Sequence, residues 1–200
     1  MLIRHRGLEP TIDPSAYVAP SATLVGDVRV GPGARILHGA VLTAEDGVVI
    51  VGPDTVVMEN ALVRGRQAHP AQIGDAVLIG PHAHVNGSTV EDEAFIATGA
   101  ALFPGSVIGA GAEVRIHGVV QVNTVVAPGA VVPIGWIAVG APATILPPEK
   151  HEEIWAIQRK LDFPGTVYGV DRDTSMRELM RRQSDYYGAH RDDVPVDGTV

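Results

Sequence analysis

The sequence predicts an all-β chain folded as a parallel β-helix, with α-helices near its C-terminal end. Aliphatic residues return at every sixth position, a period that matches neither an α-helix nor a simple alternating strand. Glycine and proline are abundant, at 23 and 15 residues, against only 3 Phe, 2 Trp and 4 Tyr. Short strands joined by tight corners produce this combination. The six-residue series contains Ile12, Val18, Leu24, Val30, Ile36, Leu42, Val51, Val57, Val63, Ile73, Ile79, Val85, Val90, Ile96, Leu102, Ile108, Val114, Val120, Val126 and Val132.

A small or compact residue stands four positions after most of these aliphatic anchors. Both should point inward, where stacked coils share one core, and the positions between them should face outward. The small positions include Ala16, Ala22, Ala34, Ala40, Ala61, Ala83, Ala94, Ala100 and Ala112. Two segments depart from the period, Asp46–Ile50 and Arg66–Gln72, and we expect them to be outward loops, which often carry function.

The pattern stops at Pro147-Pro148, so residues 1–146 are predicted to form the β-helix and residues 147–200 a helical extension that packs on it. Glu149–Leu161 has an apolar stripe at helical spacing. A second helix is expected at Met176–Tyr187, with Ser175 as its N-cap and Glu178 three residues into the helix. The tail after Gly188 is predicted to be loose.

Composition and charge exclude several classes of protein. The net charge of −8 argues against a nucleic-acid partner, because phosphate contacts need clustered cations. Cysteine is absent, which excludes disulfides and thiolate metal sites. Ile116–Pro148 carries no charge, but its prolines are incompatible with a lone membrane-spanning helix. The start, MLIRHRGLEPTID, has no apolar leader, so we expect a cytoplasmic protein with no membrane partner.

Four segments resemble the γ-class carbonic anhydrase-like proteins of the hexapeptide-repeat group. They are GDVRVGPGARILHGAVL (Gly26–Leu42), IGDAVLIGPHAHVNGSTV (Ile73–Val90), VGAPATIL (Val139–Leu146) and the terminal helix. The resemblance implies a left-handed β-helix of triangular section and a homotrimer. The first and third segments are shared with hexapeptide acyltransferases, so the resemblance also allows a transferase-like activity.

In the γ class, three histidines bind zinc or iron at the trimer interface. The resemblance places Arg64, Pro81 and Asn86 at these three positions, with Thr43 and Glu45 where the family has Arg-x-Asp. Neither a guanidinium nor a proline ring can replace a neutral imidazole, and Asn86 offers only a weak amide oxygen. Carbonic anhydrases use the metal to bring the pKa of bound water to about 7. We therefore predict no metal at the family positions, no resident cofactor and no carbonic anhydrase activity there.

Arg64 and Asn86 each follow an anchor and should stack in adjacent coils, with Thr43 below and Phe103 above. Glu59 is expected one coil beneath Pro81 on the face that meets a neighbouring subunit. Two interpretations stay open. Arg64 either pairs with Glu59 across the interface and holds the trimer, or it binds a small anionic ligand together with Asn86.

His82 and His84 lie two residues apart in a predicted strand, so they can share a face and, with His69, form a shifted metal site. The same histidines are candidate catalytic bases. Two alternative functions follow: an acyl- or acetyltransferase that uses CoA between subunits, or a thioesterase-like hydrolase that uses zinc at the shifted site. His38, at an outward position of an early coil, and His5, His151 and His190, toward the ends of the chain, are expected to be ordinary surface residues.

Outward apolar residues point to subunit association. Leu62, Leu78, Val107 and Ile116 occupy outward positions of the repeat. Such residues are costly in water unless a partner covers them. This agrees with the homotrimer that the resemblance implies.

Overall fold

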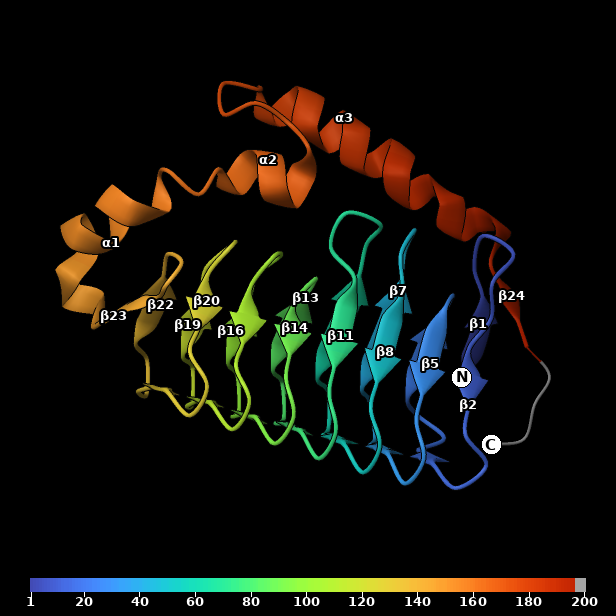
Figure 1. The fold of residues 1–200 in the computed structure, drawn as a ribbon. Helices are drawn as coiled ribbons and strands as arrows, with labels where there is room; N and C mark the ends of the chain where they lie inside the picture. Colours follow the sequence, from blue (N-terminus) through green and yellow to red (C-terminus); the bar gives the residue numbers. More distant parts are fainter. Residues whose placement is uncertain (197–200) are drawn as a thin grey trace.

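The computed structural model describes residues 1–196, and most of them wind into a β-helix with three sheets (Figure 1). The predicted all-β β-helix with C-terminal α-helices is confirmed. The ten-stranded sheet contains, in spatial order, β23 (Thr144–Leu146), β22 (Ile137–Val139), β19 (Val119–Val120), β16 (Ala101–Leu102), β13 (His84–Asn86), β10 (Leu62–Gly65), β7 (Val41–Ala44), β4 (Thr23–Val25), β1 (Leu2–Arg4) and β24 (Val194–Pro195). The strands of the three sheets are parallel, except that β23 and β24 pair antiparallel at the two ends of the ten-stranded sheet.

The other two sheets have seven strands each. The β2 sheet contains β2 (Thr11–Ile12), β5 (Val28–Val30), β8 (Val49–Val51), β11 (Ala71–Ile73), β14 (Thr89–Val90), β17 (Val107–Ile108) and β20 (Val125–Val126). The β3 sheet contains β3 (Tyr17–Val18), β6 (Arg35–Ile36), β9 (Val56–Val57), β12 (Leu78–Ile79), β15 (Phe95–Ile96), β18 (Glu113–Val114) and β21 (Val131–Val132).

The six-residue period places each anchor directly over the anchor of the next coil. Val63 of β10 pairs with Leu42 of β7 on one side and with Val85 of β13 on the other. All three are completely buried, as are the small residues Ala61 and Ala40. The predicted core is therefore confirmed for most of its residues, although Ile12 and Ala16 in the first coil are only partly buried.

The two segments that break the period leave the coil at the same edge. They connect β7 to β8 and β10 to β11, and both are shorter than predicted, because Val49 and Ala71 already begin strands. Since β7 and β10 are neighbours in the ten-stranded sheet, these two loops lie next to each other in space.

The C-terminal extension contains η1 (Pro148–Lys150), α1 (His151–Gln158), α2 (Phe163–Tyr168), α3 (Met176–Tyr187) and η2 (Gly188–Asp192). Figure 1 shows these helices along one edge of the coils, running from the last coil back to the first. Ser175 caps α3 by accepting a hydrogen bond of 3.2 Å from the Glu178 N–H, as the sequence predicts. The first predicted helix, Glu149–Leu161, is shorter than expected, because Glu149 and Lys150 belong to η1 and α1 ends at Gln158. α2 is a separate helix beyond the predicted range.

The predicted loose tail after Gly188 is wrong for the described residues. Gly188–Asp192 form η2, and β24 pairs antiparallel with β1 through Ile3–Pro195 and Arg4–Val194. An unpaired edge strand leaves backbone donors and acceptors open, and β24 satisfies those of β1. Residues 197–200 lie outside the described residues. Within residues 1–196, none of the helices combines the length and the apolarity needed to cross a membrane.

Candidate functional site

Arg64 stands on the outer face of the ten-stranded sheet, between Thr43 and Asn86 of the two adjacent strands. Strand alternation buries Val63 and turns Arg64 outward. Thr43 is 6% exposed and Asn86 is 9% exposed, whereas the Arg64 side chain keeps 25% of its surface. The predicted stacking of these three residues is therefore present, and its centre is a half-buried guanidinium.

The carboxylate beside Arg64 comes from the same chain and is Glu45. Nε of Arg64 lies 3.6 Å from Oε1 of Glu45, and the guanidinium lies 5.9 Å from the ring centre of Tyr187 in α3. Nε is buried and has no hydrogen-bond partner. Glu59 follows β9 at a corner next to the β3 sheet, so its pairing with Arg64 across subunits stays a prediction.

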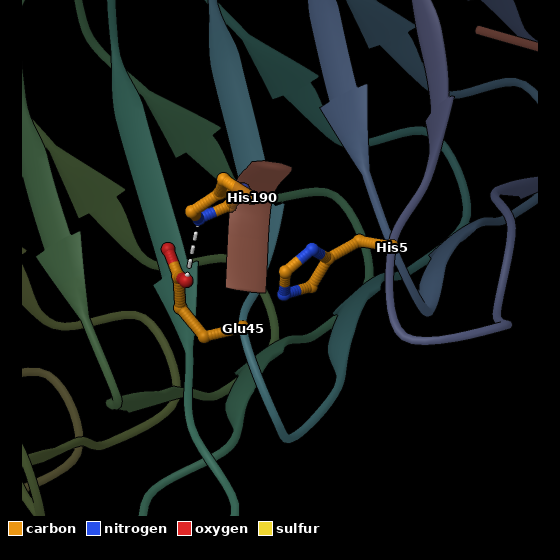
Figure 2. A group of neighbouring side chains, drawn as sticks. All are labelled: His5, Glu45 and His190. Atoms are coloured by element: carbon orange, nitrogen blue, oxygen red, sulfur yellow. Dashed lines mark hydrogen bonds and ion pairs between the residues drawn. The ribbon is translucent and has the colours of Figure 1, made fainter. Parts of the chain in front are cut away.

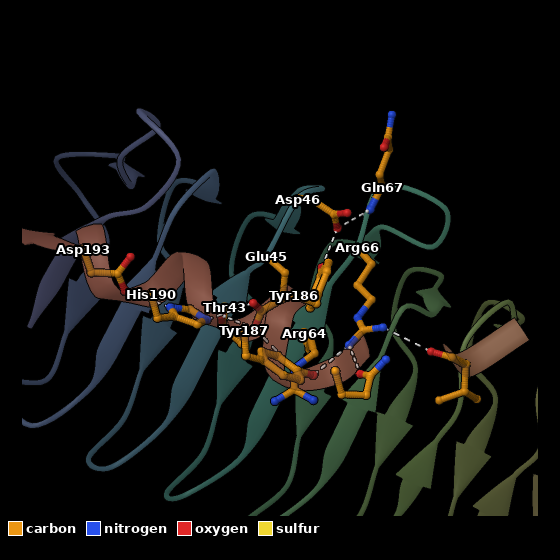
Figure 3. Close-up of polar contacts among 12 residues, drawn as sticks. Thr43, Glu45, Asp46, Arg64, Arg66, Gln67, Tyr186, Tyr187, His190 and Asp193 are labelled. Atoms are coloured by element: carbon orange, nitrogen blue, oxygen red, sulfur yellow. Dashed lines mark hydrogen bonds and ion pairs between the residues drawn. The ribbon is translucent and has the colours of Figure 1, made fainter. Parts of the chain in front are cut away.

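Glu45 is almost completely buried, at 4% exposed, where the chain leaves β7. The Thr43 hydroxyl donates a hydrogen bond of 3.1 Å to Oε1, and His190 Nε2 lies 3.0 Å from Oε2 (Figure 3). Burial would lower the pKa of His190, but its hydrogen bonds to Asp193 and Glu45 raise it instead. A buried carboxylate thus joins the β-helix to the C-terminal segment.

Arg66 lies in the loop between β10 and β11, and its guanidinium connects this loop to α2 and α3. Its Nη2 donates a hydrogen bond of 2.7 Å to the Tyr187 hydroxyl, and its Nη1 donates one of 3.1 Å to the Val167 carbonyl. The guanidinium also lies 4.6 Å from the ring centre of Tyr186. The Tyr186 hydroxyl in turn donates a hydrogen bond of 2.8 Å to the Asp46 carboxylate (Figure 3). Sequence reasoning missed these residues, although Asp46 and Arg66 begin the two segments that break the period.

These contacts change the protonation chemistry of Asp46 and Tyr186. Burial would raise the pKa of Asp46, but hydrogen bonds from Tyr186 and from the Gln67 N–H hold it below its ordinary value. The pKa of Tyr186 is raised by burial and by its hydrogen bond to Asp46. Near neutral pH the pair is therefore a phenol donating to a carboxylate.

The structure separates His82 from His84. His82 is an exposed corner residue with φ 57°, before β13 begins, so the two histidines do not alternate along one strand as predicted. His84 packs 6.1 Å from the Phe103 ring, and its pKa is lowered by burial and by the charge of Arg64. His69 lines a different cleft of about 360 Å³ below α2 and α3, and burial lowers its pKa.

The predicted shifted metal site is therefore not assembled by His82, His84 and His69. Within residues 1–196, the group of three side chains with ligand atoms close enough to hold one metal ion is His5, Glu45 and His190. The expectation that His5 and His190 are ordinary surface residues is wrong, because His5 is 2% exposed and His190 bonds to buried Glu45. No local pattern reveals this group, since its members are far apart in the sequence.

A separate apolar hollow of about 790 Å³ lies on the β3 sheet. Its lining includes Leu78, Phe95, Ile116 and Ile134, and Pro81 stands at its side. Phe95, Ile116 and Ile134 are 41%, 43% and 63% exposed. The hollow is an apolar surface of the kind that mediates subunit contacts.

Comparison with known proteins finds relatives among the γ carbonic anhydrases. The chain is 39% identical over 165 residues to gamma carbonic anhydrase 1, mitochondrial, of Arabidopsis thaliana, and 36% identical to gamma carbonic anhydrase 2, mitochondrial, of the same plant. Each match covers 76% of this chain, which spans 58% and 57% of the length of these relatives. No family model matches the chain.

Solved structures share the fold. A hexapeptide transferase family protein from Anaplasma phagocytophilum superposes with a TM-score of 0.51 at 21% identity, covering 94% of this chain and 93% of that one. A putative acetyltransferase from Bacillus cereus gives 0.52 at 20% identity, covering 92% and 95%. These matches show the fold alone. The similarity to the two plant proteins, with which the six-residue repeat and the β-helix agree, identifies the chain as a γ-carbonic anhydrase-like protein.

Proposed function

We propose that the chain is a subunit of a γ-carbonic anhydrase-like homotrimer that lacks the usual three-histidine metal site and does not hydrate carbon dioxide there. We further propose that it binds a small anion at Arg64. The observation that carries this proposal is the position of Arg64, which stands where the resemblance places a metal-binding histidine and lies 3.6 Å from Glu45.

The residues at the family positions do not fit a metal ion. Arg64 brings a fixed positive charge and has no lone pair to donate. Pro81 has no side-chain donor atom, and Asn86 alone cannot hold a divalent cation against that charge. Carbonic anhydrase chemistry of the zinc-hydroxide type therefore has no support at these positions.

An anion has better support at the same place. Leaving a buried donor without a partner costs about 1–3 kcal/mol, and more for a charged group. Nε of Arg64 is in this state, and a quarter of the side chain remains exposed. A carboxylate or bicarbonate would accept from the guanidinium in a bidentate manner, with the Asn86 amide as a further donor.

Trimer formation is supported by the apolar hollow on the β3 sheet. A neighbouring subunit would cover Phe95, Ile116 and Ile134 and bring its own Arg64 toward the face that contains Pro81 and Glu59. In that arrangement Glu59 competes with the anion for Arg64.

The alternative function is a CoA-dependent acyl- or acetyltransferase in the cleft between subunits. The observation that favours it is His84, whose lowered pKa keeps its imidazole neutral and able to accept a proton. A thioesterase-like hydrolase has less support, because it needs the shifted metal site at His82, His84 and His69. A cytoplasmic location remains an expectation from the sequence, since the plant relatives are mitochondrial by name.

The test compares the natural protein with R64Q and with a triple variant, R64H/P81H/N86H, that restores three histidines. We expect no carbon dioxide hydration by the natural protein, bicarbonate or acetate binding in calorimetry that R64Q abolishes, and metal uptake at the restored histidines. Light scattering measures the trimer. Carbon dioxide hydration by the natural protein that R64Q abolishes, or CoA binding without anion binding, would refute the proposal.

A further inference from the structure

We propose that His5, Glu45 and His190 form a second, intrachain metal site for a first-row divalent ion such as zinc or ferrous iron. The three residues come from distant segments: His5 follows β1, Glu45 follows β7 and His190 lies in η2. In Figure 2 the His190 ring contacts the Glu45 carboxylate, and the His5 ring lies beside this pair. Their ligand atoms all lie within 4.8 Å of one another.

Asp193 orients both imidazoles. Its Oδ1 lies 2.6 Å from Nδ1 of His5 and its Oδ2 lies 2.8 Å from Nδ1 of His190. Each Nδ1 therefore donates its proton to the carboxylate, which leaves the Nε2 atoms to face the common point. Metal-binding histidines are held in this way, with the second ring nitrogen donating to a carboxylate.

The carboxylate of Glu45 is oriented in the same manner. Thr43 and Arg64 hold its Oε1, while its Oε2 lies 3.0 Å from Nε2 of His190. Two lone pairs at this distance repel each other unless a positive species lies between them. A proton can serve, and a metal ion would take its place.

The unpartnered Nε2 of His5 points to the metal rather than to the proton. The His5 side chain is 1% exposed, and its Nε2 is buried with no hydrogen-bond partner. The ring stacks against His190 with centres 4.3 Å apart, so one proton between His190 and Glu45 leaves the His5 nitrogen unsatisfied. An ion bound to all three atoms satisfies it.

The donor set selects the kind of ion. Two imidazole nitrogens and one carboxylate oxygen suit zinc or ferrous iron, whereas calcium and magnesium prefer oxygen ligands. Zinc bonds of about 2.0–2.2 Å would require the ligand atoms, which now lie within 4.8 Å of one another, to move closer together around the ion. The partly exposed side of His190 would leave a fourth position for water or an exogenous ligand.

The test is metal binding by the full chain without an affinity tag, using zinc and cobalt chloride as probes. Elemental analysis gives the stoichiometry, the cobalt absorption spectrum gives the donor geometry, and calorimetry gives the affinity. We compare the natural protein with H5Q, H190Q and D193N. The controls are H151Q, an exposed histidine in α1, and the double variant H82Q/H84Q.

We expect one ion per chain, an affinity loss of more than about 100-fold in H5Q and H190Q, and a loss of about 10–100-fold in D193N, which removes only the orienting group. Both controls should bind like the natural protein. Absence of a bound ion, or unchanged binding by a folded H190Q, would overturn the site. Loss of binding only in H82Q/H84Q would move the metal to those histidines and would equally refute it.

Discussion

The phenol of Tyr186 donates a hydrogen bond of 2.8 Å to Oδ1 of Asp46, and this bond joins α3 to the loop that follows β7. The two residues are 140 positions apart in the sequence. The contact therefore forms only when the C-terminal helix is docked on the β-helix, and it offers a direct measure of that docking.

Tyr186→Phe keeps the ring and removes this hydrogen bond. Because the acceptor is a charged carboxylate, we expect a loss of about 1–3 kcal/mol in the free energy of unfolding and faster amide exchange in α3. Urea denaturation and hydrogen exchange measure the two effects. Tyr17→Phe, at an exposed tyrosine of β3, is the control and should change neither. Unchanged exchange in α3 would contradict the docking role.

His84 makes stability depend on pH. Its folded-state pKa is lowered by burial and by Arg64, so the unfolded chain, with a histidine pKa of about 6.5, binds the proton more tightly. The stability that neutral His84 contributes is complete above about pH 6.5 and is lost as the pH falls through the folded pKa. His84→Gln should reduce this acid-side decline, whereas His151→Gln should not. A His84 titration midpoint above 6.5 by NMR would contradict the prediction.

Phe95→Glu places a charge in the apolar hollow of the β3 sheet. We expect this variant to prevent assembly of the proposed trimer, because burying an unpaired carboxylate opposes association. Light scattering would then report a monomer with an intact circular dichroism spectrum. Val125→Glu, on the exposed surface of the β2 sheet, is the matched control and should keep the mass of the natural protein. If Phe95→Glu keeps the mass of the natural protein, as Val125→Glu should, the hollow is not the subunit contact.

Leu102→Ala tests the core of the β-helix. Leu102 is completely buried between Val85 and Val120, so its truncation should cost about 2–5 kcal/mol of unfolding free energy. Leu8→Ala, at a residue that is 53% exposed, should cost less than about 0.5 kcal/mol. Equal urea denaturation midpoints for the two variants would mean that Leu102 does not stabilise the stacked coils.

The parts of the structure that repeat were predictable from the sequence. The period assigns Val63 to the core and Arg64 to the surface, and the register between coils then brings Arg64 beside Asn86. The cap at Ser175 was equally predictable, because a capping box is a local pattern. His82 was misplaced because corner positions of the coil adopt positive φ, and the period does not distinguish them from strand positions.

The candidate metal group could not be predicted, because neither periodicity nor spacing connects its members. His5 and Asp193 are 188 residues apart and meet only because η2 and β24 return to the first coil. A strand as short as Val194–Pro195 carries no alternation that would reveal it. α2 was missed for a similar reason, since its Pro164 and Gly165 discourage a helical assignment that the side chain of Asp162 stabilises at its start.

The pairing of β24 with β1 also determines when, during synthesis, the outer edge of the first coil can be paired. During synthesis the first coil emerges first, yet its outer edge obtains a partner only when residues 194 and 195 have been made. Until then β1 presents unpaired backbone groups of the kind that join other chains. A chain that ends before β24 would therefore keep its stacked coils but leave this edge of β1 open to pairing with a strand of another molecule.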